Sequence, residues 1–174
     1  MQSAVAEETI PALMDGIEQL FQSYHGLVFR TAYRITGNPT DAEDVLQTVF
    51  LRLMGRDGTA ASVENPERYL RRAAINAALD IVRARRPVES VLSADSQPDP
   101  GELDAGELRE CLRRALASLN PQTAEIFALR FFEGYSNPEI ARLLGVSLVR
   151  VAVTVHRARR QLQKQIRSYL GGKS

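Results

Sequence analysis

The chain has 174 residues, of which 44% are hydrophobic and 25% charged, a balance typical of one or two small globular domains and not of a disordered chain. Its single cysteine, Cys111, excludes an internal disulfide, and no apolar run reaches the roughly 18 residues of a membrane span, so we expect a cytoplasmic protein. The net charge of +1 hides an asymmetry: residues 1–87 hold 10 basic and 11 acidic groups, residues 88–107 hold 0 and 6, and residues 108–174 hold 12 and 4.

Apolar residues recur every three or four positions from Leu13 to Ile35 and predict one long amphipathic helix that ends at Gly37. A second helix is predicted to begin at a capping box of Thr40 and Glu43. Its first turn is rich in acids. Because the helix dipole favours acids there, helix stabilisation alone explains them without a binding partner.

The stretch from Gly55 to Glu64 has the composition of a surface loop, and Asn65 followed by Pro66 predicts the start of a third helix that runs to about Arg86. This helix is basic, with an early aromatic residue and a central amide. Such a helix suits single-stranded DNA, although a solvated charged face with the aromatic ring in the core explains the pattern equally well.

Pro87 ends the third helix, and residues 88–107 contain two prolines, two glycines and no positive charge, so we interpret them as an acidic flexible linker. Further helices are predicted from about Leu108 to Leu119 and from Pro121 towards Gly134. No segment alternates clearly enough to predict a strand. The sequence therefore predicts an all-α fold of two small helical domains, residues 1–87 and 108–174.

The segment 136–160 predicts a helix-turn-helix. Ser136 and Glu139 form a capping box, Gly145 supplies a left-handed residue, and Val151 and Val155 are expected to bury one face of the second helix. The opposite face is expected to meet DNA through Ser147, Val149, Arg150, Val153, Thr154, Arg157 and Arg159. A plain helical hairpin is the alternative, which we disfavour because residues 142–174 carry eight Arg or Lys and no acid.

Few residues are available for chemistry. The chain has two histidines and one cysteine, no glycine-rich phosphate loop and no nucleophile with an evident base partner. We therefore expect no metal, no cofactor and no enzymatic activity.

Three segments together carry a more specific signal: DAEDVLQTVFLRL, ENPERYLRRAAINAALDIVRARR and LASLNPQTAEIFALRFFEGYSNPEIARLLGVSLVRVAVTVHRARRQL. In this order across an acidic linker they resemble the extracytoplasmic-function (ECF) sigma factors of bacterial RNA polymerase, over roughly residues 20–162. The resemblance implies a transcription initiation factor that directs core RNA polymerase to promoters, reads the minus-ten and minus-thirty-five elements and assists DNA melting. Residues 1–87 would form the region 2-like domain and residues 108–174 the region 4-like domain.

The resemblance also implies a role for each segment. The acidic helix would dock on the clamp helices of the largest polymerase subunit through Asp41, Glu43, Asp44 and Gln47. The loop 55–64 would capture a flipped base, and the basic helix would hold the minus-ten strand through Arg68, Tyr69, Arg71, Arg72, Asn76 and Arg83. The helix-turn-helix would read the minus-thirty-five element. Expected partners are the polymerase clamp helices and flap region, promoter DNA and an anti-sigma factor.

The sequence departs from the family in two places. Ala152, Val153 and Thr154 stand where polar or basic residues are usual, which predicts an altered minus-thirty-five preference. Thr48 stands where an acid is common, so its phosphorylation is one hypothesis for control of docking. Two other functions stay open at this point: a stand-alone helix-turn-helix regulator, and a helical adaptor or enzyme with an incidental hairpin.

Overall fold

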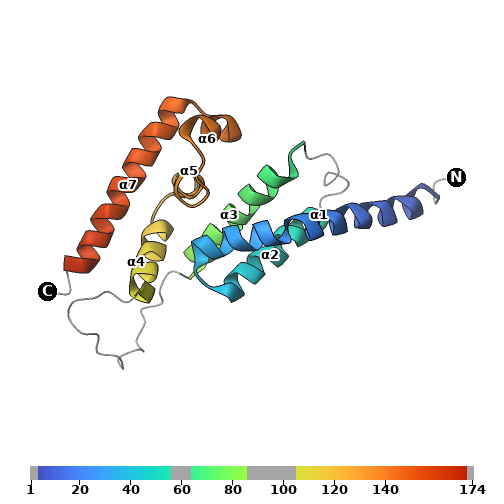
Figure 1. Cartoon of the computed structure of the whole chain (residues 1–174), viewed down its shortest axis with the longest axis horizontal. Helices are drawn as coiled ribbons and strands as arrows, with labels where there is room; N and C mark the ends of the chain where they lie inside the picture. The colour runs from blue at the N-terminus through green and yellow to red at the C-terminus, as the bar shows by residue number, and fades with distance from the viewer. Residues whose placement is uncertain (1–3, 56–63, 86–104, 172–174) are drawn as a thin grey trace, which may run out of the picture. The chain divides into compact units, whose positions relative to one another are not determined.

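The structure is a computed structural model that describes residues 4–55, 64–85 and 105–171, and every regular element in this part of the chain is an α-helix (Figure 1). In chain order the helices are α1 (Ala4–Thr36), α2 (Pro39–Met54), α3 (Pro66–Ala84), α4 (Ala105–Ala117), α5 (Pro121–Phe131), α6 (Asn137–Leu144) and α7 (Leu148–Gly171). The predicted all-α fold is confirmed. Residues 56–63 of the predicted loop and 88–104 of the predicted linker lie outside the described residues.

The chain divides into two compact units. The first contains α1 as far as Arg34, α2, and α3 as far as Ala78. The second contains Ile35–Gly37 at the end of α1 and the end of α3 from Leu79, together with α4, α5, α6 and α7.

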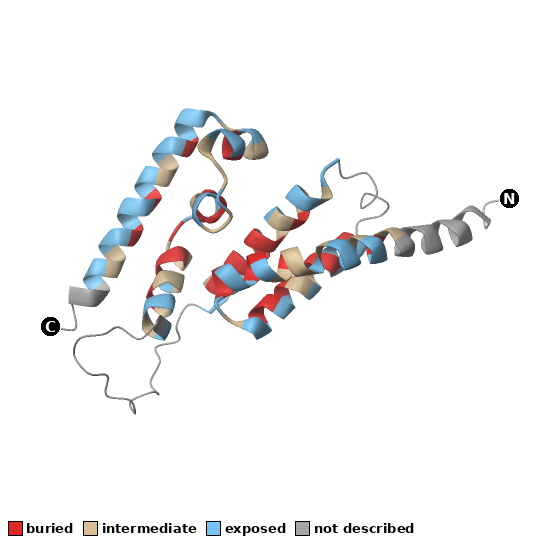
Figure 2. Ribbon diagram, viewed as in Figure 1, coloured by how far each residue is buried: buried red, intermediate tan, exposed pale blue. Residues whose placement is uncertain are grey.

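The core of the first unit is built from the inward stripes of its three helices. Val28 of α1, Val45 of α2 and Ile75 of α3 are fully buried, and residues three or four positions away on each helix are buried with them (Figure 2). Each such side chain contributes about 1.5–3 kcal/mol through removal of apolar surface from water. Because these stripes pack together, the other faces of α2 and α3 are exposed to solvent.

The start of α2 differs from the prediction. The helix begins at Pro39, and its N-cap is Asn38, whose Oδ1 accepts hydrogen bonds from the backbone N–H groups of Thr40 at 2.8 Å and Asp41 at 3.4 Å. The predicted capping box at Thr40 is therefore wrong. Asparagine is among the strongest N-cap residues and proline suits the first helical position, so the earlier pair sets the start.

In the second unit, α4, α5 and α6 pack against α7. Leu116 of α4, Leu129 of α5 and Ile140 of α6 are buried, as are Val151 and Ala158 of α7. In Figure 2 the buried residues of α7 follow one side of the helix, which leaves a long exposed side.

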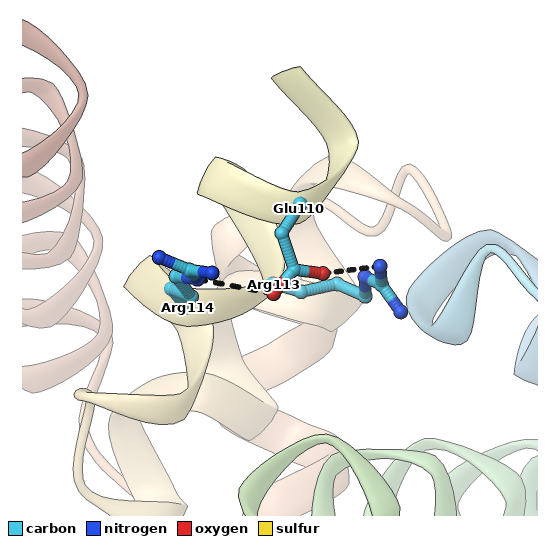
Figure 3. A network of polar contacts seen from close by, with 3 residues as sticks. All are labelled: Glu110, Arg113 and Arg114. Atoms are coloured by element: carbon cyan, nitrogen blue, oxygen red, sulfur yellow. Dashed lines mark hydrogen bonds and ion pairs between the residues drawn. The ribbon is translucent and has the colours of Figure 1, made fainter. Parts of the chain in front are cut away.

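One ion-pair network lies on α4 (Figure 3). The carboxylate of Glu110 accepts a hydrogen bond from Arg113 through one oxygen and from Arg114 Nε through the other, at 3.0 Å. Pairs at these helical spacings on a partly exposed surface contribute only a few tenths of a kcal/mol each, about 0.3–0.5.

Candidate nucleic-acid and polymerase interfaces

The helix-turn-helix predicted between residues 136 and 160 is formed by α6 and α7. The Glu139 carboxylate accepts a hydrogen bond from the backbone N–H of Ser136 at 2.8 Å, which completes the predicted capping box. Gly145 ends α6 with a φ of 65°, in the left-handed region that favours glycine. The next residue, Val146, donates its N–H to the carbonyl of Ala141 at 3.0 Å and closes the turn.

The second helix starts at its own cap. Ser147 Oγ accepts a hydrogen bond from the backbone N–H of Arg150 at 3.2 Å. Val151 is fully buried, whereas Val155 is only half-buried, and Ala158 and Leu162 complete the inward side. The inward stripe thus fixes the rotation of α7 about its axis and decides which residues face solvent.

The face opposite this stripe carries the residues predicted to meet DNA. Val149 is 72% exposed and Val153 42%, and Thr154 is half-buried at the margin of the face. The structure leaves the other members exposed at the surface: Ser147, Arg150, Arg157 and Arg159. We call this set the outward face of α7. It contains cations and apolar groups and no acid.

One polar contact on this face is absent from the sequence prediction. Arg150 Nη2 donates a hydrogen bond to Gln122 Oε1 at 2.7 Å. Gln122 lies in the first turn of α5, which is capped by Asn120. The two partners are 28 residues apart, so no local pattern reveals the contact. It ties the guanidinium of Arg150 to the side of α7 that faces α5.

On α3, three of the predicted minus-ten residues come together in one pocket. Tyr69, Arg72 and Asn76 line it from α3, and Val49 and Arg52 line it from α2. The pocket has a volume of about 690 Å³. An aromatic ring, two guanidinium groups and an amide thus surround a space large enough for a small ligand or a nucleobase. Arg52 is a site residue that sequence reasoning missed.

The other predicted minus-ten arginines have different surroundings. Arg68 is exposed. Arg71 Nη2 lies 2.6 Å from Glu67 Oε1, and Arg83 Nη1 lies 3.3 Å from Asp80 Oδ1, each an ion pair within α3. A nucleic-acid phosphate would compete with these carboxylates, so both arginines offer less free charge than the count of basic residues indicates.

The four predicted polymerase-binding residues of α2 do not share one face. Glu43, Asp44 and Gln47 are exposed and follow one another at helical spacing. Asp41 is only 2% exposed and lies with Val45 on the inward side. Its side chain therefore does not contribute to the outer surface of α2. Thr48 is half-buried.

The exposed face of α2 continues into an apolar groove shared with α1. The groove has a volume of about 580 Å³ and is lined by Ile17, Glu18, Phe21, Gln47, Phe50, Leu51 and Met54. Leu51 is 64% exposed and Met54 41%, which is unusual for large apolar side chains so close together. The outer surface of α2 is thus acidic towards its start and apolar towards its end.

Comparison with known proteins assigns both parts of the chain to known protein families. The Sigma-70 region 2 family model matches residues 20–88, and the Sigma-70, region 4 model matches residues 109–162. The RNA polymerase sigma-E factor of Streptomyces avermitilis is 32% identical over 154 residues, which cover 87% of this chain and 85% of that protein. The ECF RNA polymerase sigma factor SigE of Mycolicibacterium smegmatis is 34% identical over 166 residues, which cover 87% of this chain and 62% of that protein. The chain belongs to the ECF sigma factors.

Two solved structures are similar to this ECF sigma factor in fold. CnrH in complex with the cytosolic domain of CnrY has a TM-score of 0.53 at 23% identity, covering 87% of this chain and 88% of that one. The sigma factor RpoE in complex with the anti-sigma factor NepR from Bartonella quintana also has a TM-score of 0.53, at 21% identity. The match covers 86% of this chain and 96% of that one. At these identities the likeness is one of fold.

Membership of the family establishes the general function. The ECF sigma factor is a transcription initiation factor that gives RNA polymerase promoter specificity. This disfavours the stand-alone regulator that the sequence left open, because the matches span both units. Among the described residues, no cluster of three or more His, Cys, Asp or Glu is placed to hold a metal ion, and no helix is long and apolar enough to cross a membrane.

Proposed function

We propose that this sigma factor directs core RNA polymerase to its promoters by reading the minus-thirty-five element with α7 and the minus-ten element with α3, while α2 docks on the polymerase. The observation that carries the proposal is the outward face of α7. It follows a turn closed by two caps, it is exposed, and it presents arginines without any acid. A helix with these properties fits the major groove of duplex DNA.

At the minus-thirty-five element, the first turns of α7 meet base edges and the arginines meet phosphates. The residues assigned to this contact are Ser147, Val149, Arg150, Val153, Thr154, Arg157 and Arg159. Phosphate contacts set affinity and register, whereas contacts with base edges set specificity. Arg157 and Arg159 are exposed on either flank, which supports their assignment to the two phosphate backbones.

At the minus-ten element, the pocket between α2 and α3 accepts an extruded base. The ring of Tyr69 offers a stacking surface, the amide of Asn76 pairs with a base edge, and Arg72 and Arg52 attract the neighbouring phosphates. Capture of an extruded base favours the open duplex, which is how the sigma factor assists melting. Arg68, Arg71 and Arg83 bind the strand outside the pocket, the last two after release from their carboxylates.

On the polymerase side, the exposed face of α2 docks on the clamp helices of the largest subunit. Glu43 and Asp44 supply charge complementarity, and Gln47 leads into the groove that Leu51 and Met54 line. Asp41 is buried and is not assigned to the contact with the partner. The second unit docks on the flap region, as expected from the family.

An anti-sigma factor competes with polymerase for the first unit. CnrH and RpoE have been solved with CnrY and NepR, respectively, and the same class of partner is proposed here. The groove between α1 and α2 supports the proposal, because its exposed apolar side chains and adjoining acids suit the apolar and basic faces of an amphipathic helix.

The test is promoter-dependent transcription by core RNA polymerase on a genomic promoter library, with and without this chain. We expect transcripts that start at defined positions only when the chain is present, and we expect the chain to co-purify with core polymerase. A library that yields no such start sites, together with no co-purification, would contradict the proposal. DNA binding without polymerase binding would instead revive the stand-alone regulator.

A further inference from the structure

The centre of the outward face of α7 is apolar. Ala152 and Val153 follow Val149 by three and four residues, so both adjoin it on the helix surface, and we call the three residues the valine stripe. All three are exposed, and Val149 is 72% exposed. In the following turn the same line continues with His156, which is also exposed. Val149 and Val153 lie on the side of α7 opposite the buried Val151, and Ala152 lies beside them.

In the first two turns of α7 no charged side chain lies within the valine stripe, and further along the helix the same line reaches Arg160, four residues after His156. Each residue advances about 100° around a helix axis, which places Arg150 and Arg157 on one flank and Arg159 on the other. Arg150 is also held towards α5 by its hydrogen bond of 2.7 Å to Gln122. The first two turns of α7 thus present methyl groups at their centre and hydrogen-bond donors at their margins.

The major groove contains one apolar group that matches such a centre. Every base edge there offers hydrogen-bond donors or acceptors, and thymine alone adds a methyl group, at C5. A valine against guanine or cytosine would leave polar base atoms without partners, which is costly in a desolvated contact. A valine against thymine removes two apolar groups from water. Arginines at the margins are placed for the phosphates on each side of the groove.

We propose that Val149 and Val153 are specificity-determining residues that read thymine methyl groups in the minus-thirty-five element, while the flanking arginines bind phosphate. The inference rests on the proposed function of α7 as the reader of that element. It adds the chemistry of the reading: the favoured element has thymine, on either strand, at the positions that face the valine stripe. Loss of one buried methyl contact weakens binding about fourfold.

The experiment uses holoenzyme reconstituted from core polymerase and the full chain. A promoter is first selected from a library randomised in the minus-thirty-five element. Each thymine of the selected element is then replaced singly by deoxyuridine, which removes the methyl group and leaves the pairing edge unchanged. We expect the dU substitution at one or two positions to weaken promoter binding about fourfold, and a dU substitution outside the element to have no effect.

Variants decide whether the valines carry this effect. With Val149→Ala or Val153→Ala, promoters with dT and with dU at the corresponding position are expected to bind equally, because the variant has lost the partner of the methyl group. With Arg157→Ala, both promoters are expected to weaken by the same factor, so the fourfold preference for dT persists. This coupling between one side chain and one methyl group separates direct contact from a change in DNA shape or in the stability of α7.

The outcomes separate the two proposals. A holoenzyme that selects promoters but tolerates dU throughout the element, or selects an element without thymine, would overturn the valine reading and leave the proposed function standing. A preference for dT that persists in both valine variants would also overturn it. Failure of the holoenzyme to select any promoter would overturn the proposed function, and the valine reading with it.

Discussion

Gly145 shows how one residue shapes the proposed minus-thirty-five reader. Its φ of 65° allows the chain to leave α6 and begin α7 after a short turn. A Cβ built at this position meets no atom within 4 Å, so a side chain here would be penalised only by backbone strain. In the left-handed region that strain is about 1–2 kcal/mol for a residue with a Cβ.

We therefore predict opposite effects for the same substitution at two glycines. Gly145→Ala is expected to lower the free energy of unfolding by about 1 kcal/mol, and Gly16→Ala, inside α1 and equally free of steric contact, to raise it by about 1 kcal/mol. Urea unfolding followed by circular dichroism measures both. If Gly145→Ala were neutral or stabilising, the left-handed turn would not be present in solution.

Cys111 is the single thiol, and it is 4% exposed. Burial raises the pKa of the Cys111 thiol above its ordinary value; the positive charge of Arg114 opposes this in part, and the carboxylate of Glu110 adds to it. The folded chain therefore holds the thiol proton more tightly than the unfolded chain does. Because the thiolate is the reactive form, Cys111 is expected to react slowly with thiol reagents.

We predict that Cys111 in the native chain reacts roughly tenfold or more slowly with a thiol reagent at pH 8 than it does in 8 M urea, as followed by absorbance or mass. Stability should also fall as the pH rises past the pKa of an exposed thiol, because only the unfolded chain then releases the proton. Cys111→Ser should remove that alkaline decrease. Rapid native labelling would place the thiol at the surface.

Asp41 and Gly145 also mark the limits of reading single residues from sequence. The conformation of Gly145 follows from local backbone sterics, so the pattern predicted it. The burial of Asp41 depends on the rotation of α2 against its neighbours. The sequence alone did not show which of the three acids in the first turn of α2 is buried. One signal was present: Asp41 precedes the fully buried Val45 by four residues and so belongs to the inward stripe.

At the scale of the helix, contacts within about five residues were predictable and longer ones were not. The caps at Asn65 and Ser136 lie where the sequence places them. At α2, two strong cap signals overlap, and the earlier one at Asn38 prevails. By contrast, the contact between Gln122 and Arg150 depends on how α5 lies against α7, which no local pattern contains.

A second long-range contact joins Ser118, the residue that follows α4, to the C-terminal half of α7. Gln165 Nε2 donates a hydrogen bond to Ser118 Oγ at 2.8 Å, and the two residues are 47 positions apart. The Ser118 hydroxyl lies 2.7 Å from the carbonyl of Ala115 and 3.1 Å from Gln165 Oε1, either of which can accept its proton. This half-buried contact holds the distal part of α7 against the end of α4.

We predict that Ser118→Ala lowers the free energy of unfolding by about 1 kcal/mol, the usual net worth of a partly buried hydrogen bond. Gln165→Ala should have a similar effect, and the double variant should add little beyond either single change, because both remove one contact. Gln163→Ala, exposed on the same helix, is the matched control and should be neutral. Additive losses in the double variant would mean that the two side chains act separately.

For the whole molecule, charge distribution predicts two parts on either side of an acidic stretch, whereas the two compact units of the structure meet within α3, between Ala78 and Leu79. The acidic stretch between two helical segments and the basic C-terminal third indicated two parts with different partners. The pocket of Tyr69, Arg72 and Asn76 and the apolar groove of α1 and α2 were not predictable, because each is a space between helices. Periodicity reveals which side chains are buried but not what shape the exposed ones enclose.

The proposal for the whole molecule assigns polymerase docking and minus-thirty-five reading to different helices, so single substitutions should separate the two. Asp44→Arg reverses a charge on the exposed face of α2 and is expected to weaken binding to core polymerase about tenfold. Asp44→Asn, which only removes the charge, should have a smaller effect. Neither change should alter the salt dependence of duplex binding, because Asp44 lies outside the proposed DNA contacts.

Arg157→Ala is expected to have the opposite effect to Asp44→Arg. It should leave core polymerase binding unchanged and weaken promoter binding, and the slope of log affinity against log salt should fall by about one, as expected for the loss of a single phosphate contact. Fluorescence anisotropy with core polymerase and with promoter duplex measures the two affinities independently. If Asp44→Arg and Arg157→Ala impaired both affinities equally, each would be acting through stability, and the separate assignment of α2 and α7 would be wrong.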